Sequence, residues 1–327
     1  MDKYPVSSKS LEKHYYINGD QFGQQYKDHL SDYHSWDQKD HASEWLLFPG
    51  NIGPNLSIDE TSPSNGELYT IVTNKAAKGQ KGALVAMIKG TESESIIKVL
   101  KQIPEASRKK VTEVTLDMAT SMHKIVKQCF PVASRVIDRF HVQKLAYDAL
   151  QEMRISHRWD AINEETEAME QAKYKGEKYE PFRFVNGDSM KQLLARSRYL
   201  LLKSPNKWSN SQKIRAQILF AQYPDIQKAY SLTHQLRLIF NLTKDKRVAY
   251  TKLAHWYNDV TDSVFKAFNS ISATIYTHYP EILNFFDNRS TNASAESFNA
   301  KIKAFRTNLR GVRDINFFLY RLSKIYA

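Results

Sequence analysis

The chain has only one cysteine, Cys129, in 327 residues. A single thiol cannot form an internal disulfide, nor can it supply the paired cysteines of a zinc finger or ribbon. No activating group stands near Cys129 in the sequence, so we interpret it as a buried structural thiol. No apolar run approaches the ~20 residues that a helix needs to span a bilayer. The polar residues 1–8 do not resemble a signal peptide, so we expect a cytoplasmic, reducing setting.

Positive charge is what the chain has in excess. It carries 47 Lys and Arg against 35 Asp and Glu, a formal net charge of +12. Such a balance favours a polyanionic partner, either nucleic acid or an anionic membrane surface. The hydrophobic content of 42% is sufficient for a core, and the length predicts one large core with an insertion or two domains.

Strand and helix signals alternate in the first half of the chain. Three strand-like segments at 56–59, 67–73 and 83–88 are separated by turn clusters at 62–66 and 78–82, which predicts an antiparallel meander. A helix at 93–103, a strand at 111–116, a helix at 118–130, a strand at 133–137 and a helix from 139 towards 154 follow. This β-β-β-α-β-α-β-α order predicts an α/β fold with a ribonuclease H-like mixed sheet.

The remaining segments read as helical. Residues 156–285 show helical apolar spacing with almost no strand signal, which indicates an all-helical insertion, and residues 1–50 read as short helices leading into a loop at 48–54. The predicted divisions are therefore an N-terminal helical segment (1–50), the first part of the core (51–155), the helical insertion (156–285) and C-terminal core helices (286–327).

Three acidic residues stand where each can direct a carboxylate towards a shared point. Asp59 closes the strand-like 56–59, Asp117 closes 111–117, and Glu296 opens a helical run at 296–303. Carboxylate oxygens are hard ligands that suit Mg²⁺ or Mn²⁺, and two such ions can activate a nucleophile and stabilise a leaving oxygen in phosphodiester chemistry. The pattern predicts an acidic two-metal site on a DNA-seeking chain.

Each acid taken alone has an ordinary structural explanation. Asp117 and Asp138 directly precede predicted helices, where Asp is a common N-cap, and Asp59 precedes a predicted turn. Ligand sites in open sheets, however, form beyond the carboxyl ends of parallel strands. If the first strand pairs with the fourth, Asp59 and Asp117 are neighbours about 5 Å apart. Asp138 would be one strand further away, so Asp117 is the preferred second ligand and Asp138 the alternative.

Two further groups accompany the acids. His141 is placed to orient a carboxylate or to contact the scissile phosphate, with a capping or core histidine as the alternative. Residues 289–327 carry eight Lys or Arg against two acids. Five of these bases form a predicted phosphate-tracking surface, for which a solvated helix face is the alternative. They are Lys301, Lys303, Arg306, Arg310 and Arg313.

Four segments together resemble a known family: Ser-Ile-Asp-Glu at 57–60, Leu-Asp-Met-Ala at 116–119, the run at 130–142 that contains Asp-Arg-Phe-His, and 292–299 followed by Lys301 and Lys303. They resemble bacterial insertion-sequence transposases of the DDE superfamily, ISL type, distantly related to Mutator-like elements, from about Leu46 to the C-terminus. The resemblance implies that Asp59, Asp117 and Glu296 bind two Mg²⁺ or Mn²⁺ ions, with helices inserted between the second Asp and the Glu.

The resemblance also implies that Asp138 and His141 form an auxiliary element. The implied activity is cleavage at the element ends followed by strand transfer into target DNA, by a nucleoid-associated homo-oligomer. Relatives commonly carry a cysteine zinc ribbon and a helix-turn-helix, which are not visible in residues 1–50, so end recognition is expected to involve a separate polypeptide or a truncated remnant. A structure-specific nuclease and a domesticated, non-catalytic DNA-binding protein are the alternatives.

Overall fold

The computed structural model describes residues 1–63 and 66–327 and divides into two compact units. The core unit comprises Met1–Asp138 and Asn288–Ala327, and the helical unit comprises Arg139–Asp287. The domain limits predicted at residues 50, 155 and 285 stay predictions. The predicted turn at 62–66 lies partly outside the described residues.

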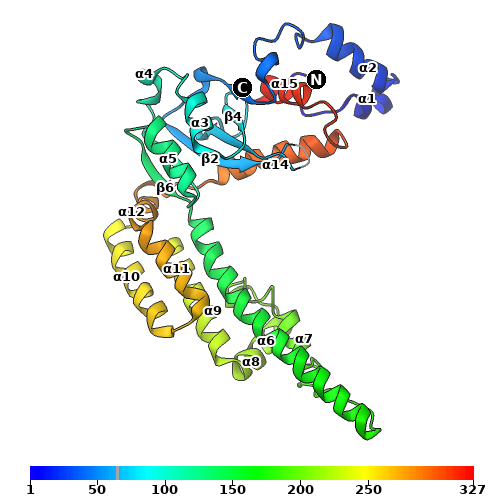
Figure 1. The fold of residues 1–327 in the computed structure, drawn as a ribbon, viewed down its shortest axis with the longest axis vertical. Helices are drawn as coiled ribbons and strands as arrows, with labels where there is room; N and C mark the ends of the chain where they lie inside the picture. Colours follow the sequence, from blue (N-terminus) through cyan, green and yellow to red (C-terminus); the bar gives the residue numbers. More distant parts are fainter. Residues whose placement is uncertain (64–65) are drawn as a thin grey trace. The chain divides into compact units, whose positions relative to one another are not determined.

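The core unit is built on a six-stranded sheet with the order β1-β4-β3-β2-β5-β6. Strands β2, β3 and β4 form an antiparallel meander, and β5 and β6 extend it in parallel from β2 (Figure 1). The strands are β1 (Trp45–Leu47), β2 (Asn55–Thr61), β3 (Tyr69–Asn74), β4 (Leu84–Lys89), β5 (Glu113–Leu116) and β6 (Ser134–Ile137). This mixed sheet is consistent with the predicted ribonuclease H-like arrangement.

Two strand assignments differ from the sequence-based expectation. Residues 1–50 contain β1, which pairs antiparallel with β4, although only helices and a loop were expected there. A strand of three residues is too short to show an alternating pattern, so only its pairing reveals it. Strand β2 continues through Asp59 to Thr61, because Glu60 pairs with Thr70 of β3 and Thr61 with Tyr69. Asp59 therefore lies inside a strand and not at its end.

The two faces of the sheet are covered by different helices. Helices α3 (Ser93–Leu100) and α5 (Thr120–Cys129) share a buried cluster with Leu56 and Ile58 of β2, while α4 (Glu105–Arg108) connects α3 to β5. Helices α14 (Ala293–Asn308) and α15 (Ile315–Tyr326) share a second cluster with Ile71 of β3. Because side chains alternate along a strand and Asp59 pairs with Ile71, Asp59 faces the α14 layer.

Cys129 lies at the end of α5 and is fully buried, which confirms the predicted structural thiol. Burial raises the pKa of this thiol to about 11, so the reactive thiolate is disfavoured at neutral pH.

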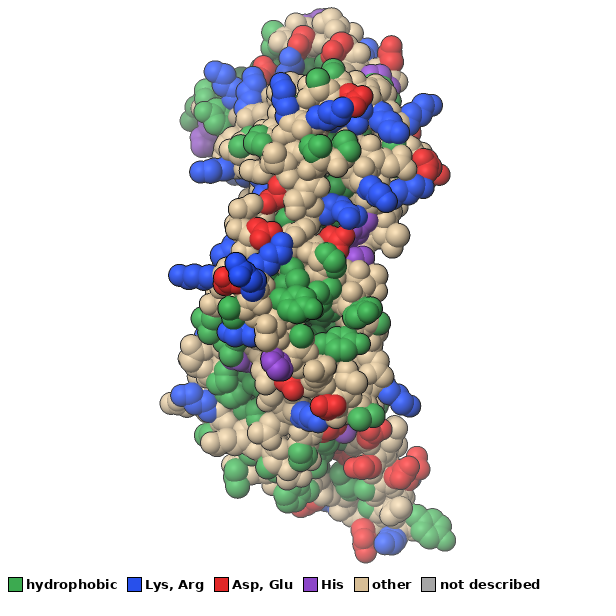
Figure 2. Space-filling model, turned by 90° about the vertical axis from the view of Figure 1, so that its left-hand side faces the viewer, with side chains coloured by type: hydrophobic (Ala, Val, Ile, Leu, Met, Phe, Trp, Pro, Cys, Tyr) green, Lys and Arg blue, Asp and Glu red, His purple; other side chains and the backbone are tan. Residues whose placement is uncertain are grey.

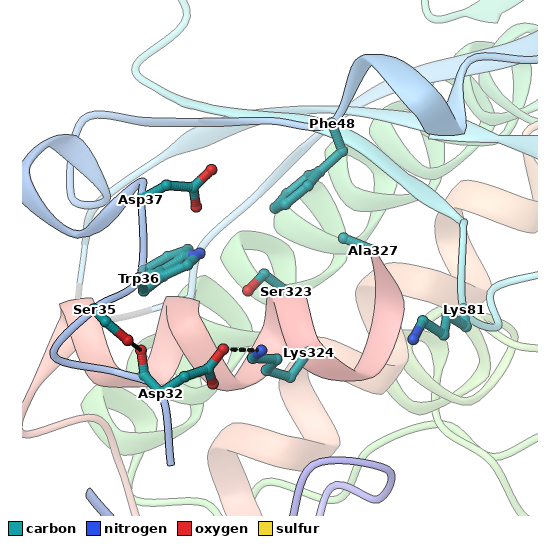
Figure 3. Close-up of a pocket in the computed structure, with 9 residues that line it drawn as sticks. All are labelled: Asp32, Ser35, Trp36, Asp37, Phe48, Lys81, Ser323, Lys324 and Ala327. Carbon is teal, nitrogen blue, oxygen red and sulfur yellow. Dashed lines mark hydrogen bonds and ion pairs between the residues drawn. The ribbon is translucent and has the colours of Figure 1, made fainter. Parts of the chain in front are cut away.

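The N-terminal segment is held to α15 by hydrogen bonds. It contains α1 (Ser8–Tyr15), α2 (Gly19–Gln25) and a short π-helix (Tyr26–Leu30). Arg321 of α15, 1% exposed, donates hydrogen bonds to the carbonyls of Met1, Tyr4 and Val6. Asp32, Trp36 and Lys324 are among the residues that line a pocket of about 380 Å³. Figure 3 shows the ion pair between Asp32 and Lys324 near the ring of Trp36. Four 3₁₀ turns complete the connections, at Lys39–His41, Pro49–Asn51 and Lys75–Ala77 in the core unit and Pro205–Lys207 in the helical unit.

All regular structure in the helical unit is helical. Its helices are α6 (Arg139–Lys175), α7 (Met190–Arg196), α8 (Asn210–Gln222), α9 (Pro224–Leu242), α10 (Lys246–Ser263), α11 (Lys266–Thr277), α12 (Tyr279–Leu283) and α13 (Phe285–Asn288), the last ending at the unit boundary. Helix α6 runs without a break past residue 154, where we expected it to end. No Gly or Pro interrupts it before Gly176, which adopts a φ of +71°.

Candidate active site

Asp59 of β2 and Asp117, the residue directly after β5, lie at the same level of two adjacent parallel strands. The β2–β5 ladder pairs Ser57 with Thr115, and the two acids are the residues two positions further along each chain. Parallel neighbours are about 5 Å apart, and residues two apart share a face. The strand pairing on which the choice of Asp117 depended is thus confirmed. Asp138 follows β6, one strand further out, because Leu116 pairs with Ile137.

Helix α14 contacts Asp59 through Asn299. The side-chain Nδ2 of Asn299 donates to Asp59 Oδ2 at 2.8 Å and to the Glu60 carbonyl at 3.2 Å. Since both acceptors are oxygens, the amide can point only one way, and its Oδ1 is buried without a hydrogen-bond partner among the described residues. Glu296 is exposed in the first turn of α14, three residues before Asn299. Residues three apart share a side of a helix, so Glu296 lies towards the same edge of the sheet.

Negative charge is concentrated around Asp59 and the carboxyl end of β5. The pKa of Glu60 is raised, first by burial and then by the charges of Asp117 and Asp59. Asp59 also accepts the backbone N–H of Glu60 at 2.8 Å, and Asp117 accepts that of Ala119 at 2.7 Å. These bonds orient the two carboxylates while their charges disfavour the ionised form of Glu60, an arrangement that favours a bound cation.

The donor set fits a hard divalent ion. Among residues 1–63 and 66–327, no three His, Cys, Asp or Glu side chains stand close enough together to hold a metal. Mg²⁺ is usually bound through one or two carboxylates and completes its shell with water and substrate phosphate oxygens. Asp59 and Asp117 supply such a pair, with the orphaned Oδ1 of Asn299 beside them. Convergence of Asp59, Asp117 and Glu296 on one metal position stays a prediction.

Asp138 connects the end of β6 to the start of α14. Its side chain is 2% exposed and accepts the backbone N–H of Asn292 at 3.1 Å. Asn292 directly precedes α14, four residues before Glu296. The other predicted auxiliary residue, His141, lies in the first turn of α6 and is partly buried; its role stays a prediction.

Glu113 is a buried acid whose role the sequence argument missed. It is 5% exposed at the start of β5 and accepts from Lys75 Nζ at 3.2 Å, from Asn288 Nδ2 at 3.2 Å and from the Ser290 hydroxyl. Glu113 therefore holds the segment by which the chain re-enters the core unit. A signal was present: Glu113, Thr115 and Asp117 alternate with apolar residues and mark a polar face of this strand.

The predicted DNA-contacting bases divide into two groups. Lys303 is exposed and Arg306 partly buried; they follow Asn299 at helical spacing and so share the Glu296 side of α14. Lys301 lies on the opposite flank, where its ammonium donates to the Gly79 carbonyl at 2.7 Å. The other two bases, Arg310 and Arg313, are exposed in the loop after the helix. On the face drawn in Figure 2, Lys and Arg side chains are spread across the core unit.

The mixed sheet with an acidic edge is consistent with the α/β class of ribonuclease H-like transposases. A family model of ISL3-type DDE transposases, described as a transposase, matches residues 56–322. The chain therefore belongs to this transposase family, which confirms the resemblance, and its substrate is DNA. No curated protein matches the chain. None of the described helices has the length and apolar character required to cross a membrane.

Proposed function

We propose that the protein is a metal-dependent transposase that cleaves DNA at the ends of an insertion sequence and joins the freed end to target DNA. One observation carries the proposal. The β2–β5 register sets Asp59 level with Asp117, and the bond from Asn299 brings the helix that bears Glu296 to the same edge. The fold that would support this site is a ribonuclease H-like sheet with the helices of 139–287 inserted between Asp117 and Glu296.

In the proposed site Asp59, Asp117 and Glu296 hold two divalent ions. Bound Mg²⁺ or Mn²⁺ would supply an activated water and charge stabilisation for the leaving oxygen. Asn299 fixes the orientation of the Asp59 carboxylate. Asp138 holds the start of α14 and so positions Glu296, with His141 as the second auxiliary residue.

The proposed chemistry consists of two in-line displacements at phosphorus. Water oxygen bonds to the phosphorus at the element end while the bond to the 3′-oxygen breaks, which leaves a 3′-hydroxyl. That hydroxyl then attacks a target phosphate and releases a target 3′-hydroxyl. The surrounding bases bind the phosphates, with Lys301 contributing less because Gly79 already accepts from its ammonium. The cationic set is Lys301, Lys303, Arg306, Arg310 and Arg313.

The proposal includes a wider assembly. Pairing of two element ends requires two copies or more, so we infer a homo-oligomer on DNA in the nucleoid. For recognition of the end sequence, the proposal includes either a separate polypeptide or a truncated remnant of the end-binding region.

A strand-transfer assay tests the proposal. A labelled element end, together with target DNA and any required end-binding partner, is incubated with Mg²⁺, Mn²⁺ or EDTA. A transposase gives cleaved and joined products that EDTA abolishes. A structure-specific nuclease gives cleaved product alone, and a non-catalytic DNA-binding protein gives neither. The last two outcomes would each overturn the proposal.

A further inference from the structure

A second basic site lies in the core unit beyond the far end of α14. There a cleft of about 680 Å³ is lined by Lys9 and Lys13 of α1 and by Arg310 and Arg313 of the following loop. The lining contains one acid, Asp20, which pairs with Lys9 at 2.9 Å. Four cations against one anion leave a net charge of +3, and the hydroxyls of three serines add hydrogen-bonding groups.

Hydrogen bonds join the two segments that line the cleft. Asn308 Nδ2 donates to the Pro5 carbonyl at 3.2 Å, just before α1, and Arg321 holds the backbone of Met1 and Val6. On the other wall, Arg310 adopts a φ of +56° and turns the chain after the helix. The cationic groups are thus presented from two anchored segments.

The cleft stands at a defined distance from the carboxylates. Glu296 lies in the first turn of α14, which ends at Asn308. Asn308 lies twelve residues after Glu296, so at 1.5 Å per residue the two are about 18 Å apart along the helix axis. Duplex DNA rises 3.4 Å per base pair, so this distance corresponds to about five base pairs. Lys303 and Arg306 lie between the two points on the same side of the helix as Glu296.

We propose that this cleft binds the phosphate backbone of duplex DNA about five base pairs from the scissile phosphate. Ammonium and guanidinium groups with neighbouring hydroxyls match the non-bridging oxygens of a phosphodiester, which carry no sequence information. The inference rests on the proposed function, since Glu296 marks the cleavage point. It adds α1, outside the matched family region of 56–322, to the DNA-binding surface.

The first test measures binding without cleavage, in EDTA. The double variant Lys13→Ala, Arg313→Ala should lower the slope of log affinity against log salt by about 1.8, because each lost phosphate contact removes about 0.9. Raising the salt fourfold should then weaken the wild type about tenfold more than the variant. The matched control is Lys98→Ala, Lys127→Ala, exposed lysines of α3 and α5. An unchanged slope in the cleft variant would overturn the proposal, whatever the protein cleaves.

The second test locates the contact along the DNA. Substrates are shortened on one side of the cleavage point, then on the other, to about three or twelve base pairs, bracketing the expected contact. At low salt, the cleft variant should bind the long substrate about tenfold more weakly than the wild type does. Both proteins should bind the short substrate equally well when it is truncated on the contacted side. Equal weakening on all lengths would overturn the assigned distance. Failure of wild type to cleave any substrate would reject the proposed function and leave the binding test intact.

Discussion

Acidic side chains in the two units have opposite electrostatic surroundings: Asp188 of the helical unit is buried, whereas Asp59, Glu60 and Asp117 of the core unit are partly buried. In the helical unit, Asp188 is fully buried and pairs with Arg215 at 2.8 Å and with Arg196. Burial alone would raise the pKa of Asp188, but the hydrogen bonds from both arginines lower it. In the core unit, burial and the charges of Asp117 and Asp59 together raise the pKa of Glu60.

This difference distinguishes an acid whose charge is balanced within its own unit from acids that we propose to bind a cation. The charge of Asp188 is balanced by side chains of its own unit, so its removal should disturb stability alone. In the core unit, the charges of Asp117 and Asp59 raise the energy of the charged form of Glu60, which a bound cation would relieve. The contrast therefore predicts which substitutions affect catalysis and which affect folding.

The largest effect should follow removal of a predicted ligand. Asp59→Asn, Asp117→Asn or Glu296→Gln should lower cleavage by at least about 10³-fold, because several kcal/mol of charge stabilisation is lost. DNA affinity should be unchanged or slightly higher, since a negative charge near the polyanion is removed. Single-turnover cleavage and gel-shift titration measure the two.

The controls for these variants are matched substitutions on exposed acids of α6, Asp148→Asn and Glu152→Gln, which should leave cleavage unchanged. If Asp117→Asn remained active while Asp138→Asn abolished cleavage, Asp138 would be the second ligand.

Asp188→Asn should affect stability instead. The substitution leaves Arg215 without its counter-ion and should cost about 3 kcal/mol, a fall in Tm of roughly 6–12 °C. Because the pKa of Asp188 is lower in the folded state than its ordinary value of 3.8, the charge of Asp188 stabilises the folded protein above pH 3.8. This stabilisation is lost as the pH falls through the folded-state pKa. The difference in Tm between wild type and variant should thus be full at neutral pH and shrink in acid. Lost activity in folded Asp188→Asn would break the comparison.

Divalent ions should stabilise the core unit. At ten times its dissociation constant, Mg²⁺ should contribute about 1.4 kcal/mol of stability, measured as a rise in Tm. Asp117→Asn should reduce this gain and Asp188→Asn should not. An equal gain in both variants would mean that the ion binds elsewhere.

The next largest effect concerns the residues that hold α14 and the chain before it. Asp138→Asn and Glu113→Gln should each lower the maximal cleavage rate about tenfold, a cost of about 1.4 kcal/mol, with DNA affinity unchanged. Asp138→Glu should recover part of the rate if the carboxylate positions Asn292. A change in DNA affinity alone would argue against positioning.

The parts of the fold and of the candidate site that could be predicted from the sequence are those that short-range patterns specify. Turn clusters and apolar periodicity were sufficient for the meander and the parallel extension. The β2–β5 pairing that places Asp59 beside Asp117 was only a condition of the sequence argument, and the strand register supplies it. Helix α6 was predicted too short because its charged second half has little apolar periodicity. The hydrogen bonds of Glu113 to Asn288 and Ser290 join residues about 175 positions apart, and no local pattern specifies such contacts.

The smallest expected effect distinguishes the two sides of α14. Lys303 is exposed on the side that Glu296 shares, whereas Lys301 donates to the Gly79 carbonyl. An ammonium already bonded within the protein has fewer donors for phosphate, while an exposed one releases a counterion when DNA binds. Lys303→Ala should therefore lower the salt slope by about 0.9 for all DNA sequences alike, and Lys301→Ala by clearly less. Gel-shift titrations of both variants over a salt series measure this. A larger loss for Lys301→Ala, or a loss confined to one DNA sequence, would mean that the DNA path does not follow the Glu296 side of the helix.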